Sequence, residues 1–423
     1  MQTALANPFR ETPAGRDADR ILRSCVHCGF CNATCPTYQL LGDELDGPRG
    51  RIYLIKQMLE GNAVTPHTLL HLDRCLTCRN CETTCPSGVQ YGRLLDIGRE
   101  TAEARIARPW RERVVRWLLR GLIPYPARFR PLLRFGQWLR PVLPARLKRR
   151  VPRAGTSMPW PAPRHARRML LLEGCVQPVL APGINAACAR VLDRFGISVL
   201  RAEGEVCCGA ALHHTSGPDE GLDFARRNID AWWPQVESGI EAIISSASGC
   251  GVHVKDYGHL LHADPAYADR ARRVSALTRD LSEIVAKDDL ARLRSDVPPG
   301  MKIAFQSPCT LQHGQKLNGV VEQLLRDLGF VLLPVAEAHL CCGSAGTYSI
   351  LQSDLSARLR TRKLQALQAP QPEIIVTANI GCLTHLQAGA DVPVRHWIEL
   401  LADAVDRGEG NIANTRGRAQ LKP

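Results

Sequence analysis

Two stretches with the same cysteine spacing constrain the fold of this chain more than any other feature. They read CVHCGFCNATCP and CLTCRNCETTCP, and both follow the pattern C-x2-C-x2-C-x3-C-P. This is the spacing of bacterial ferredoxins, in which three cysteines hold one [4Fe–4S] cluster and the fourth ligates the other cluster. The predicted ligand sets are Cys25, Cys28, Cys31 and Cys85 for one cluster, and Cys75, Cys78, Cys81 and Cys35 for the second.

Zinc is the main alternative, because paired C-x2-C elements also form zinc sites. A zinc site takes four ligands, usually from two pairs, whereas each stretch here offers three evenly spaced cysteines and then a fourth. The thirty-nine residues between Cys35 and Cys75 contain apolar side chains at helical spacing (Ile52, Ile55, Met58 and Leu59) before Gly61. We therefore predict a helical domain with two clusters.

An internal repeat organises the C-terminal half of the chain. Three cysteines recur 134 residues later with unchanged spacing, and a fourth recurs after 132 residues. The surrounding stretches also match, for example IISSASGC and IVTANIGC. The first copy contains Cys175, Cys207, Cys208 and Cys250, and the second contains Cys309, Cys341, Cys342 and Cys382.

Each copy presents predicted strands and helices in the same order. A short apolar strand, MLLLEG or MKIAFQS, precedes a cysteine and an amphipathic helix. A second strand leads to a Cys-Cys-Gly triplet (CCG) and another helix, and a third strand, AIISSA or EIIVTA, ends at Gly-Cys. Strands that alternate with helices predict a parallel α/β sheet. The cysteines fall where strands end, the usual location of sites in such sheets.

The CCG triplets do not predict disulfide bonds. Adjacent Cα atoms lie about 3.8 Å apart, below the roughly 4.4 Å at which ordinary disulfides begin. The four thiols of each copy indicate a [4Fe–4S] site, a reactive dithiol or plain buried thiols, and the sequence leaves these open. His253 and His385, three residues after the last cysteine of each copy, are expected to face out of the following helix. Cys188 is expected to pack within its helix.

The composition favours a metal or redox role for the 17 cysteines among the 423 residues. The N-terminal stretch MQTALANPFRETPAGRDADR lacks the apolar region of a secretion signal. No stretch approaches the 18 or more apolar residues of a membrane span. We therefore expect a cytoplasmic location, where clustered cysteines bind metals or exchange electrons.

The positive charge of the chain is concentrated in one segment. Between Arg105 and Arg168 there are 18 Lys and Arg residues and one acid, Glu112, whereas the whole chain has a net charge of +13. Aromatic residues are interspersed among these arginines. Residues 105–168 are expected to contact an acidic partner or a membrane surface, which would place the chain peripherally on the cytoplasmic face of the inner membrane. An internal strap is the alternative, and no nucleic acid is expected because no recognition motif is present.

Together, these motifs resemble the iron–sulfur subunits of glycolate oxidase (glycolate dehydrogenase). The resemblance rests on CVHCGFCNATCPTYQLLGDELDGPRGRIYLIKQMLEG, HLDRCLTCRNCETTCPSG, ASGCG and HLCCGSAGTY…TANIGC, and it extends from about residue 20 to residue 400. It implies an oxidoreductase complex in which a partner flavoprotein oxidises glycolate to glyoxylate. This chain then carries the electrons onward to a quinone or another acceptor.

The repeats also resemble the cysteine-rich CCG domains of heterodisulfide reductase. Those domains typically end in C-x-x-C, whereas Ala247 and Asn379 stand three residues before the last cysteine of each copy here. This departure argues against the five-cysteine, non-cubane cluster of that family and against disulfide reduction. Coordination by four thiols is compatible with the sequence.

The sequence indicates an electron carrier that does not oxidise a substrate itself. It has no G-x-G-x-x-G fingerprint, and no catalytic residue is assigned. Iron–sulfur clusters pass single electrons, so the two-electron oxidation of a 2-hydroxy acid requires a flavin, expected only on the partner subunit. The alternatives are the same role beside a lactate or glycerol-3-phosphate dehydrogenase, and a thiol–disulfide reductase acting at the CCG cysteines.

The predicted architecture is an α+β multidomain protein. A mainly helical ferredoxin-type domain with two [4Fe–4S] clusters spans residues 1–100, and a basic Arg/Pro/aromatic linker spans residues 101–168. Two repeated α/β CCG domains, which provide sites for possible further clusters, span residues 169–297 and 298–423.

Overall fold

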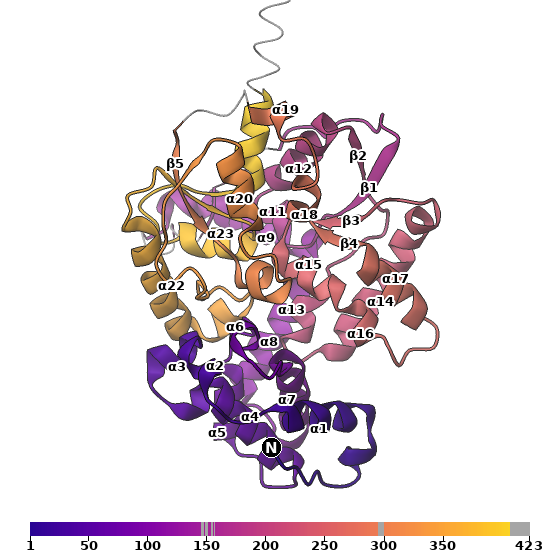
Figure 1. Cartoon of the computed structure of the whole chain (residues 1–423), viewed down its shortest axis with the longest axis vertical. Coiled ribbons are helices and arrows are strands. Elements are labelled where there is room, and N and C mark those ends of the chain that lie inside the picture. The colour runs from indigo at the N-terminus through magenta and orange to yellow at the C-terminus, as the bar shows by residue number, and fades with distance from the viewer. Residues whose placement is uncertain (145–147, 149–150, 154, 156, 295–299, 407–423) are drawn as a thin grey trace, which may run out of the picture. The chain divides into compact units, whose positions relative to one another are not determined.

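The computed structural model of the chain describes residues 1–144, 148, 151–153, 155, 157–294 and 300–406 (Figure 1). The chain divides into two compact units, and each has a buried core of its own. Unit 1 is discontinuous and comprises residues 1–118, 309–316 and 337–363. Among the described residues, unit 2 comprises those within 119–308, 317–336 and 364–406.

Unit 1 is built from short helices, and proline begins several of them at the first helical position, where its missing N–H costs nothing. The longest element of the unit is α7, followed by α1 and α4. The N-terminal helices are α1 (Pro13–Ser24), α2 (Phe30–Ala33), α3 (Pro36–Leu41), α4 (Pro48–Leu59), α5 (Pro66–Asp73), α6 (Asn80–Thr84), α7 (Tyr91–Arg105) and α8 (Trp110–Leu122, in unit 1 up to Leu118).

The helix α4 confirms the apolar stripe expected between the two cysteine stretches. Ile52, Ile55, Met58 and Leu59 are all buried in the core of unit 1. The helix ends just before Gly61, whose φ of +97° lies in the left-handed region that terminates helices. Both the buried face and the end of this helix are therefore as predicted.

Two segments from the second repeat complete unit 1. Asn80 donates a hydrogen bond from Nδ2 to the His339 carbonyl oxygen at 3.1 Å. The Tyr348 hydroxyl donates to the Arg74 carbonyl oxygen at 3.1 Å, and Leu76 packs in the same cluster as Tyr348. The elements in these segments are the π-helical turn Thr310–Gly314, α21 (Tyr348–Leu351) and the first part of α22 (Ser353–Gln368).

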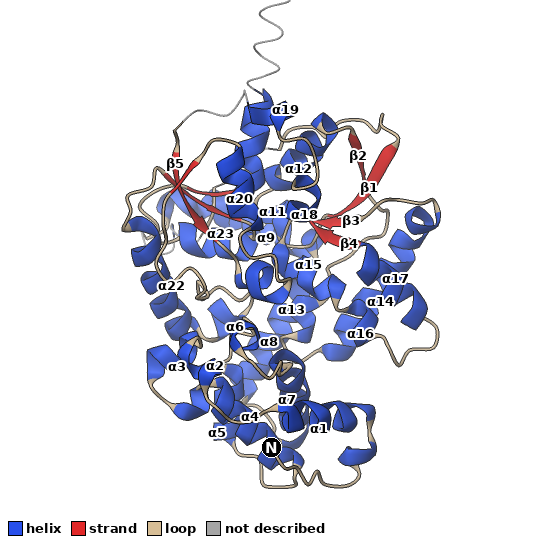
Figure 2. Ribbon diagram, in the orientation of Figure 1, coloured by secondary structure: helices blue, strands red, loops and turns tan. Residues whose placement is uncertain are grey.

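Unit 2 contains two four-stranded parallel sheets, drawn in red in Figure 2. The strand order is β2-β1-β3-β4 in the first sheet and β6-β5-β7-β8 in the second. The two orders are the same, because β5, β6, β7 and β8 take the places of β1, β2, β3 and β4. The strands are β1 (Arg167–Leu172), β2 (Ile197–Leu200), β3 (Ile243–Ser245), β4 (Thr278–Asp280), β5 (Lys302–Gln306), β6 (Val331–Leu332), β7 (Ile374–Thr377) and β8 (Val394–His396).

Helices connect these parallel strands, and central strands such as β7 are buried along their whole length, as expected when helices cover both faces of a sheet. The helices of unit 2 that precede or belong to the first sheet are α9 (Pro126–Leu139), α11 (Gln177–Leu180), α12 (Gly183–Arg194), α13 (Ala210–His213), α14 (Pro218–Glu237), α15 (Ser248–Lys255), α16 (Tyr257–Leu260), α17 (Ala268–Leu277), α18 (Leu281–Val285) and α19 (Ala291–Arg294). Those of the second sheet are α20 (Val320–Asp327), α23 (Ile380–Gln387) and a helix over residues 397–406.

The predicted fold class is confirmed, with one difference in each repeat. The three strands expected in each copy are present and parallel. A fourth strand, β4 or β8, extends each sheet and was not predicted. These strands have only three residues and contain charged side chains, so they lack the apolar run by which the others were recognised.

The two repeats contact each other within unit 2 through the loops that follow β3 and β7. Ser248 donates its N–H to the Ala378 carbonyl oxygen at 3.3 Å. His396 donates from Nε2 to the Ser246 carbonyl oxygen at 2.9 Å while its Nδ1 accepts the N–H of Ile398. Burial lowers the pKa of His396 to about 4, so the ring is neutral in this contact at physiological pH.

The described residues include no helix that is long and apolar enough to cross a membrane.

Candidate iron–sulfur centres

The two C-x2-C-x2-C loops have the same backbone conformation. The residues before and after the second cysteine have positive φ in both loops: His27 and Gly29 in the first, Thr77 and Arg79 in the second. Alternating left-handed residues curl the chain, so that successive cysteines turn toward one centre. A short helix, α2 or α6, then carries the third cysteine.

The first predicted ligand set lines one pocket, which Cys81 of the second stretch also lines. Cys25, Cys28 and Cys31 line it from the first loop, and Cys85 lines it from the second stretch. The structure therefore brings the fourth cysteine of one stretch to the first three of the other, which is the grouping that the ferredoxin spacing implies.

Two thiols of this set resist ionisation when no metal is bound. Burial raises the pKa of Cys25, and burial together with the neighbouring thiols raises the pKa of Cys31 to about 11. Thiols of this kind keep their protons at neutral pH unless a metal replaces them. Four converging thiols around a cavity are the donor set that an iron–sulfur cluster requires.

The second predicted set also converges. Burial raises the pKa of Cys78 and Cys81 well above the ordinary value, and the nearby thiols of Cys35 and Cys75 add to the rise. Tyr91 donates its hydroxyl hydrogen to Cys75 Sγ at 3.6 Å. Cys35 thus joins the three thiols of the second loop, as Cys85 joins those of the first.

A buried guanidinium lies beside this second set. Arg51 is completely buried and donates from Nε to the His71 carbonyl oxygen at 2.7 Å. Burial lowers the pKa of Arg51, but the surrounding acidic groups, led by the Cys75 thiol, raise it by more. Its carboxylate partner, Asp46, is shared with Arg74, which leaves positive charge to balance anionic thiolates. The environment therefore fits a negatively charged cluster.

The four cysteines of the first repeat form a compact thiol group within unit 2. Cys175 Sγ lies 3.1 Å from Cys207 Sγ. Hydrogen bonds from Cys207 and Cys250 lower the pKa of Cys208 well below its ordinary value. All four residues are thus in contact through their sulfur atoms, and Cys208 is the thiol most readily ionised.

The glycine of each CCG triplet is required by two features of the structure. Gly209 and Gly343 have φ of +93° and +88°, in the left-handed region. A Cβ at Gly209 would lie 2.7 Å from the Gly221 carbonyl oxygen, and one at Gly343 would lie 2.7 Å from that of Ser356. The helices α14 and α22, which contain Gly221 and Ser356, therefore pack against positions where only glycine fits.

Three cysteines of the second repeat lie in unit 1, next to the second ferredoxin set. Cys309 Sγ is 3.8 Å from Cys341 Sγ, and both pack in one cluster with Cys78. Lys363 is buried beside these thiols and donates from Nζ to the Glu337 carbonyl oxygen at 2.8 Å. Cys342 is buried in the same unit.

Cys382, the fourth cysteine of this repeat, lies in unit 2. Asn379 donates from Nδ2 to Cys382 Sγ at 3.6 Å. The other atom of the same amide, Oδ1, accepts the N–H of Gly249 at 3.3 Å. Asn379 therefore connects the Gly-Cys loops of the two repeats, at the position where related domains carry a cysteine.

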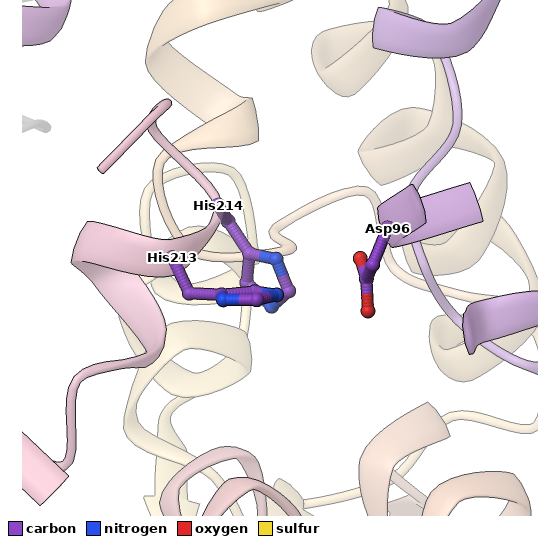
Figure 3. A group of neighbouring side chains, drawn as sticks. All are labelled: Asp96, His213 and His214. Atoms are coloured by element: carbon purple, nitrogen blue, oxygen red, sulfur yellow. The ribbon is translucent and has the colours of Figure 1, made fainter. Parts of the chain in front are cut away.

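The expectation that His253 faces outward was wrong. Its side chain is buried in α15, and its positive potential helps to lower the pKa of Cys208. The rings of His213 and His214, which lie close together at the end of α13 in Figure 3, have centroids 5.8 Å and 6.5 Å from that of His253. His385 is half-buried. Cys188 is completely buried in α12, as expected.

Sequence reasoning singled out neither Arg51 nor Lys363, and it did not foresee the contacts that Asn379 and His253 make near the thiols. Arg51 lies in the middle of a helix whose apolar stripe was recognised, and a lone arginine there carries no signal of its own. Asn379 had a visible signal, because it replaces the first cysteine of the C-x-x-C element.

Comparison with known proteins agrees with this geometry. The 4Fe-4S dicluster domain matches residues 21–89, and the Cysteine-rich domain (CCG) matches residues 169–255 and 303–387. Over 408 residues the chain is 56% identical to the glycolate oxidase iron-sulfur subunit of Escherichia coli (strain K12), with 96% of this chain and all of that protein covered. The chain belongs to the family of glycolate oxidase iron–sulfur subunits.

Other members of this family and more distant proteins share parts of the architecture. The chain is 29% identical to the probable glycolate oxidase iron-sulfur subunit of Bacillus subtilis (strain 168), with 95% of this chain and 97% of that protein covered. It is 25% identical to lactate utilization protein A of Bacillus licheniformis over 55% of this chain and 98% of that protein. The family is that of an oxidoreductase subunit with iron–sulfur cofactors.

Proposed function

We propose that this chain is the electron-transfer subunit of a glycolate-oxidising complex. A partner flavoprotein oxidises glycolate to glyoxylate, and this chain passes the electrons to a quinone or another acceptor. The observation that carries the proposal is the gathering of eight thiols from two distant stretches into two sets of four. The 56% identity to the E. coli subunit supports glycolate as the substrate of the complex.

The proposed division of labour follows from the groups present in this chain. Bound [4Fe–4S] clusters supply one-electron chemistry. The chain's own residues provide thiolates, of which Cys25, Cys35, Cys75 and Cys81 are buried away from water. They also place the Arg51 guanidinium beside the second set to offset negative charge. The flavin that accepts two electrons from the hydroxy acid is assigned to the partner subunit.

The ligands of the two clusters are proposed from the two converging sets, with four thiols each. We further propose that the CCG thiols bind metal or exchange electrons. For the second repeat, the packing of Cys309 and Cys341 against Cys78 supports this role. The proposed ligands are Cys25, Cys28, Cys31 and Cys85 for cluster 1, Cys75, Cys78, Cys81 and Cys35 for cluster 2, and Cys175, Cys207, Cys208, Cys250, Cys309, Cys341, Cys342 and Cys382 for the CCG sites.

The first experiment measures iron and acid-labile sulfide in the anaerobically purified full chain. Two [4Fe–4S] clusters require about 8 iron atoms per chain, and occupied CCG sites add to that number. Cys28→Ser removes a proposed ligand and is expected to lower the iron content by about 4 atoms per chain. Cys188→Ala, a buried cysteine outside every proposed site, is the matched control and should leave iron unchanged. Equal iron in both variants would contradict the cluster 1 assignment.

The second experiment tests the substrate. The complex purified with its flavoprotein is mixed anaerobically with glycolate, lactate or glycerol 3-phosphate, and bleaching of the iron–sulfur absorbance is followed. Glycolate is expected to bleach the clusters fastest. Bleaching by lactate alone would retain the electron-transfer role and overturn the choice of substrate.

A thiol–disulfide reductase is the second candidate function, and the short Cys175–Cys207 sulfur distance favours it. Cys208→Ser combined with Cys342→Ser would then abolish disulfide reduction and leave the signals of the ferredoxin clusters intact. Under the electron-transfer proposal, the wild-type chain shows no disulfide reduction to abolish.

A further inference from the structure

Away from the cysteines, two consecutive helices leave large aromatic side chains exposed. On α8, Trp110 is 69% exposed and Trp117 is 64% exposed. On α9, Phe135 is 58% exposed and Trp138 is 74% exposed. Trp232, by contrast, is completely buried. An exposed aromatic ring does not gain the favourable free energy that burial away from water provides. Several exposed rings on neighbouring helices therefore indicate a surface that binds a partner.

The exposed aromatic rings of α9 lie on one face of the helix. Successive residues of an α-helix are about 100° apart, which places Phe135 and Trp138 within about 60° of each other. Their rings are stacked, with centroids 6.0 Å apart. Arg130 and Arg134 fall on one side of this pair and Arg128 falls on the other, and all three are exposed. The result is an apolar strip bordered by guanidinium groups.

The helix α8 repeats this arrangement. Trp110, Val114 and Trp117 lie within an arc of about 60°, and all three are exposed. Arg113 borders the strip on one side. Arg111 borders it on the other, with its guanidinium carbon 5.5 Å from the centroid of the Trp110 ring. Two helices thus carry the same pattern of aromatic and basic residues.

The arginines of α8 and its flank divide into two groups with different roles. Arg108 and Arg116 are buried, and both bind the carboxylate of Asp73, at 2.6 Å and 3.3 Å. They attach the helix to unit 1. Arg111 and Arg113 face outward and form no ion pair within the part of the chain that the structure describes. The outward arginines are therefore available to an external anion.

The positive charge of the region that contains α8 and α9 indicates what kind of partner binds there. No Asp or Glu occurs in the sequence from Arg113 to Leu172. Aromatic rings flanked by arginine suit the headgroup layer of a bilayer, where rings sit among the carbonyls and guanidinium groups bind lipid phosphates. An acidic protein would pair with the arginines, but these convex aromatic strips would then need a matching groove on that protein.

We infer that the exposed faces of α8 and α9 bind the surface of a bilayer containing anionic phospholipids, with each helix lying in the plane of the headgroups. The strip of exposed aromatic residues bordered by arginines is complete on each helix separately. The inference goes beyond the proposed electron-transfer function and does not depend on the substrate of the complex.

The test measures binding of the purified full chain to vesicles by flotation. Vesicles of phosphatidylcholine alone are compared with vesicles that also contain phosphatidylglycerol, at low and high salt. Binding is expected only to the anionic vesicles and should weaken as salt increases. Tryptophan fluorescence should shift to shorter wavelength on binding, because the exposed rings leave water.

Two sets of variants locate the surface. Phe135→Ser with Trp138→Ser on α9, or Trp110→Ser with Trp117→Ser on α8, should each lower the vesicle partition coefficient by at least about tenfold. Arg130→Gln with Arg134→Gln should lower it on the order of tenfold at low salt and less at high salt. Val331→Ser, at a side chain that is 42% exposed on β6, is the matched control and should leave binding unchanged. Circular dichroism verifies that each variant is folded.

Three outcomes would overturn the inference: no vesicle binding by the wild type, equal binding to neutral and anionic vesicles, or unchanged binding in all helix variants. If the same variants weaken binding to the flavoprotein partner while the wild type ignores vesicles, the faces are protein-docking surfaces instead.

Discussion

The two cysteine-rich repeats share a sheet and a triplet, but their thiols have different neighbours. In the first repeat, Cys175, Cys207, Cys208 and Cys250 all lie in unit 2. In the second repeat, three of the four lie in unit 1, beside the ferredoxin cysteine Cys78. Duplication has therefore preserved the strands and the CCG loop, while the surroundings of the two sites have diverged.

The buried ionisable groups near the two sites differ: the first site has the carboxyl of Glu205 and the imidazole of His253, and the second has the ammonium of Lys363. In the first repeat, Glu205 raises the pKa of Cys250, and burial raises the pKa of Glu205 itself to about 7. In the second repeat, the buried Lys363 faces Cys341 and Cys342. A nearby cation stabilises added negative charge and a nearby carboxylate opposes it. The same set of thiols is thus placed in two different electrostatic environments.

The largest expected difference between the repeats concerns the link to the ferredoxin clusters. Cys78→Ser should remove about 4 iron atoms per chain, because it deletes a proposed ligand of the second cluster and a neighbour of Cys309. Cys208→Ser should leave the ferredoxin iron and its EPR signals unchanged. Iron analysis with EPR of the reduced protein measures both. A loss of ferredoxin signals in Cys208→Ser would show that the first repeat is equally coupled to them.

The contact that joins the repeats should depend on pH through His396. Its pKa in the folded chain, about 4, lies below the ordinary value of 6.5. Its contribution to stability is therefore complete above pH 6.5 and is lost as the pH falls toward 4. By linkage the loss is about 2 kcal/mol at pH 5 and approaches about 3 kcal/mol at lower pH.

The measurement is the midpoint of denaturation at pH 7 and pH 5 in the wild type and in His396→Asn, which does not titrate. The decrease between the two pH values should be smaller in the variant. His396 caps the helix that follows β8 by accepting the N–H of Ile398. The equivalent residue of the first repeat, Asp280 at the end of β4, caps α18 by accepting the N–H of Ser282. Identical pH profiles for the wild type and the variant would rule out His396 as the titrating group.

Substitution of the triplet glycines tests a feature that both repeats share, the close approach of a helix to the CCG triplet. Gly209→Ala and Gly343→Ala should each destabilise the chain by about 2 kcal/mol or more, because the added Cβ has positive φ and meets a carbonyl oxygen. Gly204→Ala is the control: it also has positive φ, but no atom lies within 4 Å of the added Cβ. Its cost should be about 1 kcal/mol. Denaturant titration compares the three, and equal costs would argue against the close helix approach.

The smallest expected effect is that of the amide between the repeats. Asn379→Ala should cost about 1 kcal/mol, because the N–H of Gly249 at the start of α15 loses its acceptor. Asn379→Asp keeps this acceptor and loses only the donor to Cys382 Sγ. Thermal unfolding should therefore separate the two variants, with the aspartate variant nearer to the wild type. The reverse order would show that the contact to sulfur is the more important one.

The sequence predicted those features that depend on local patterns. The cysteine runs, the apolar strands and the stripe on α4 are each encoded within a few residues, and all were recognised. The site of the second repeat was predicted only in part, because nothing near Cys309 indicates that it packs against Cys78. Lys363 and Arg51 acquire their roles from long-range packing, so their local sequence carries no signal. The outward orientation expected for His253 failed for the same reason.

The discontinuity of unit 1 has a consequence for biosynthesis. A chain made from its N-terminus exposes the ferredoxin cysteines early, but the segments that pack on Leu76 and Asn80 are made much later, at residues 309–316 and 337–363. At usual rates of translation, roughly ten seconds to a minute separate the synthesis of residue 118 from that of residue 363. During this interval the proposed second cluster site lacks part of its cover against water and oxygen. Assembly of that site is therefore a late event in the life of the nascent chain.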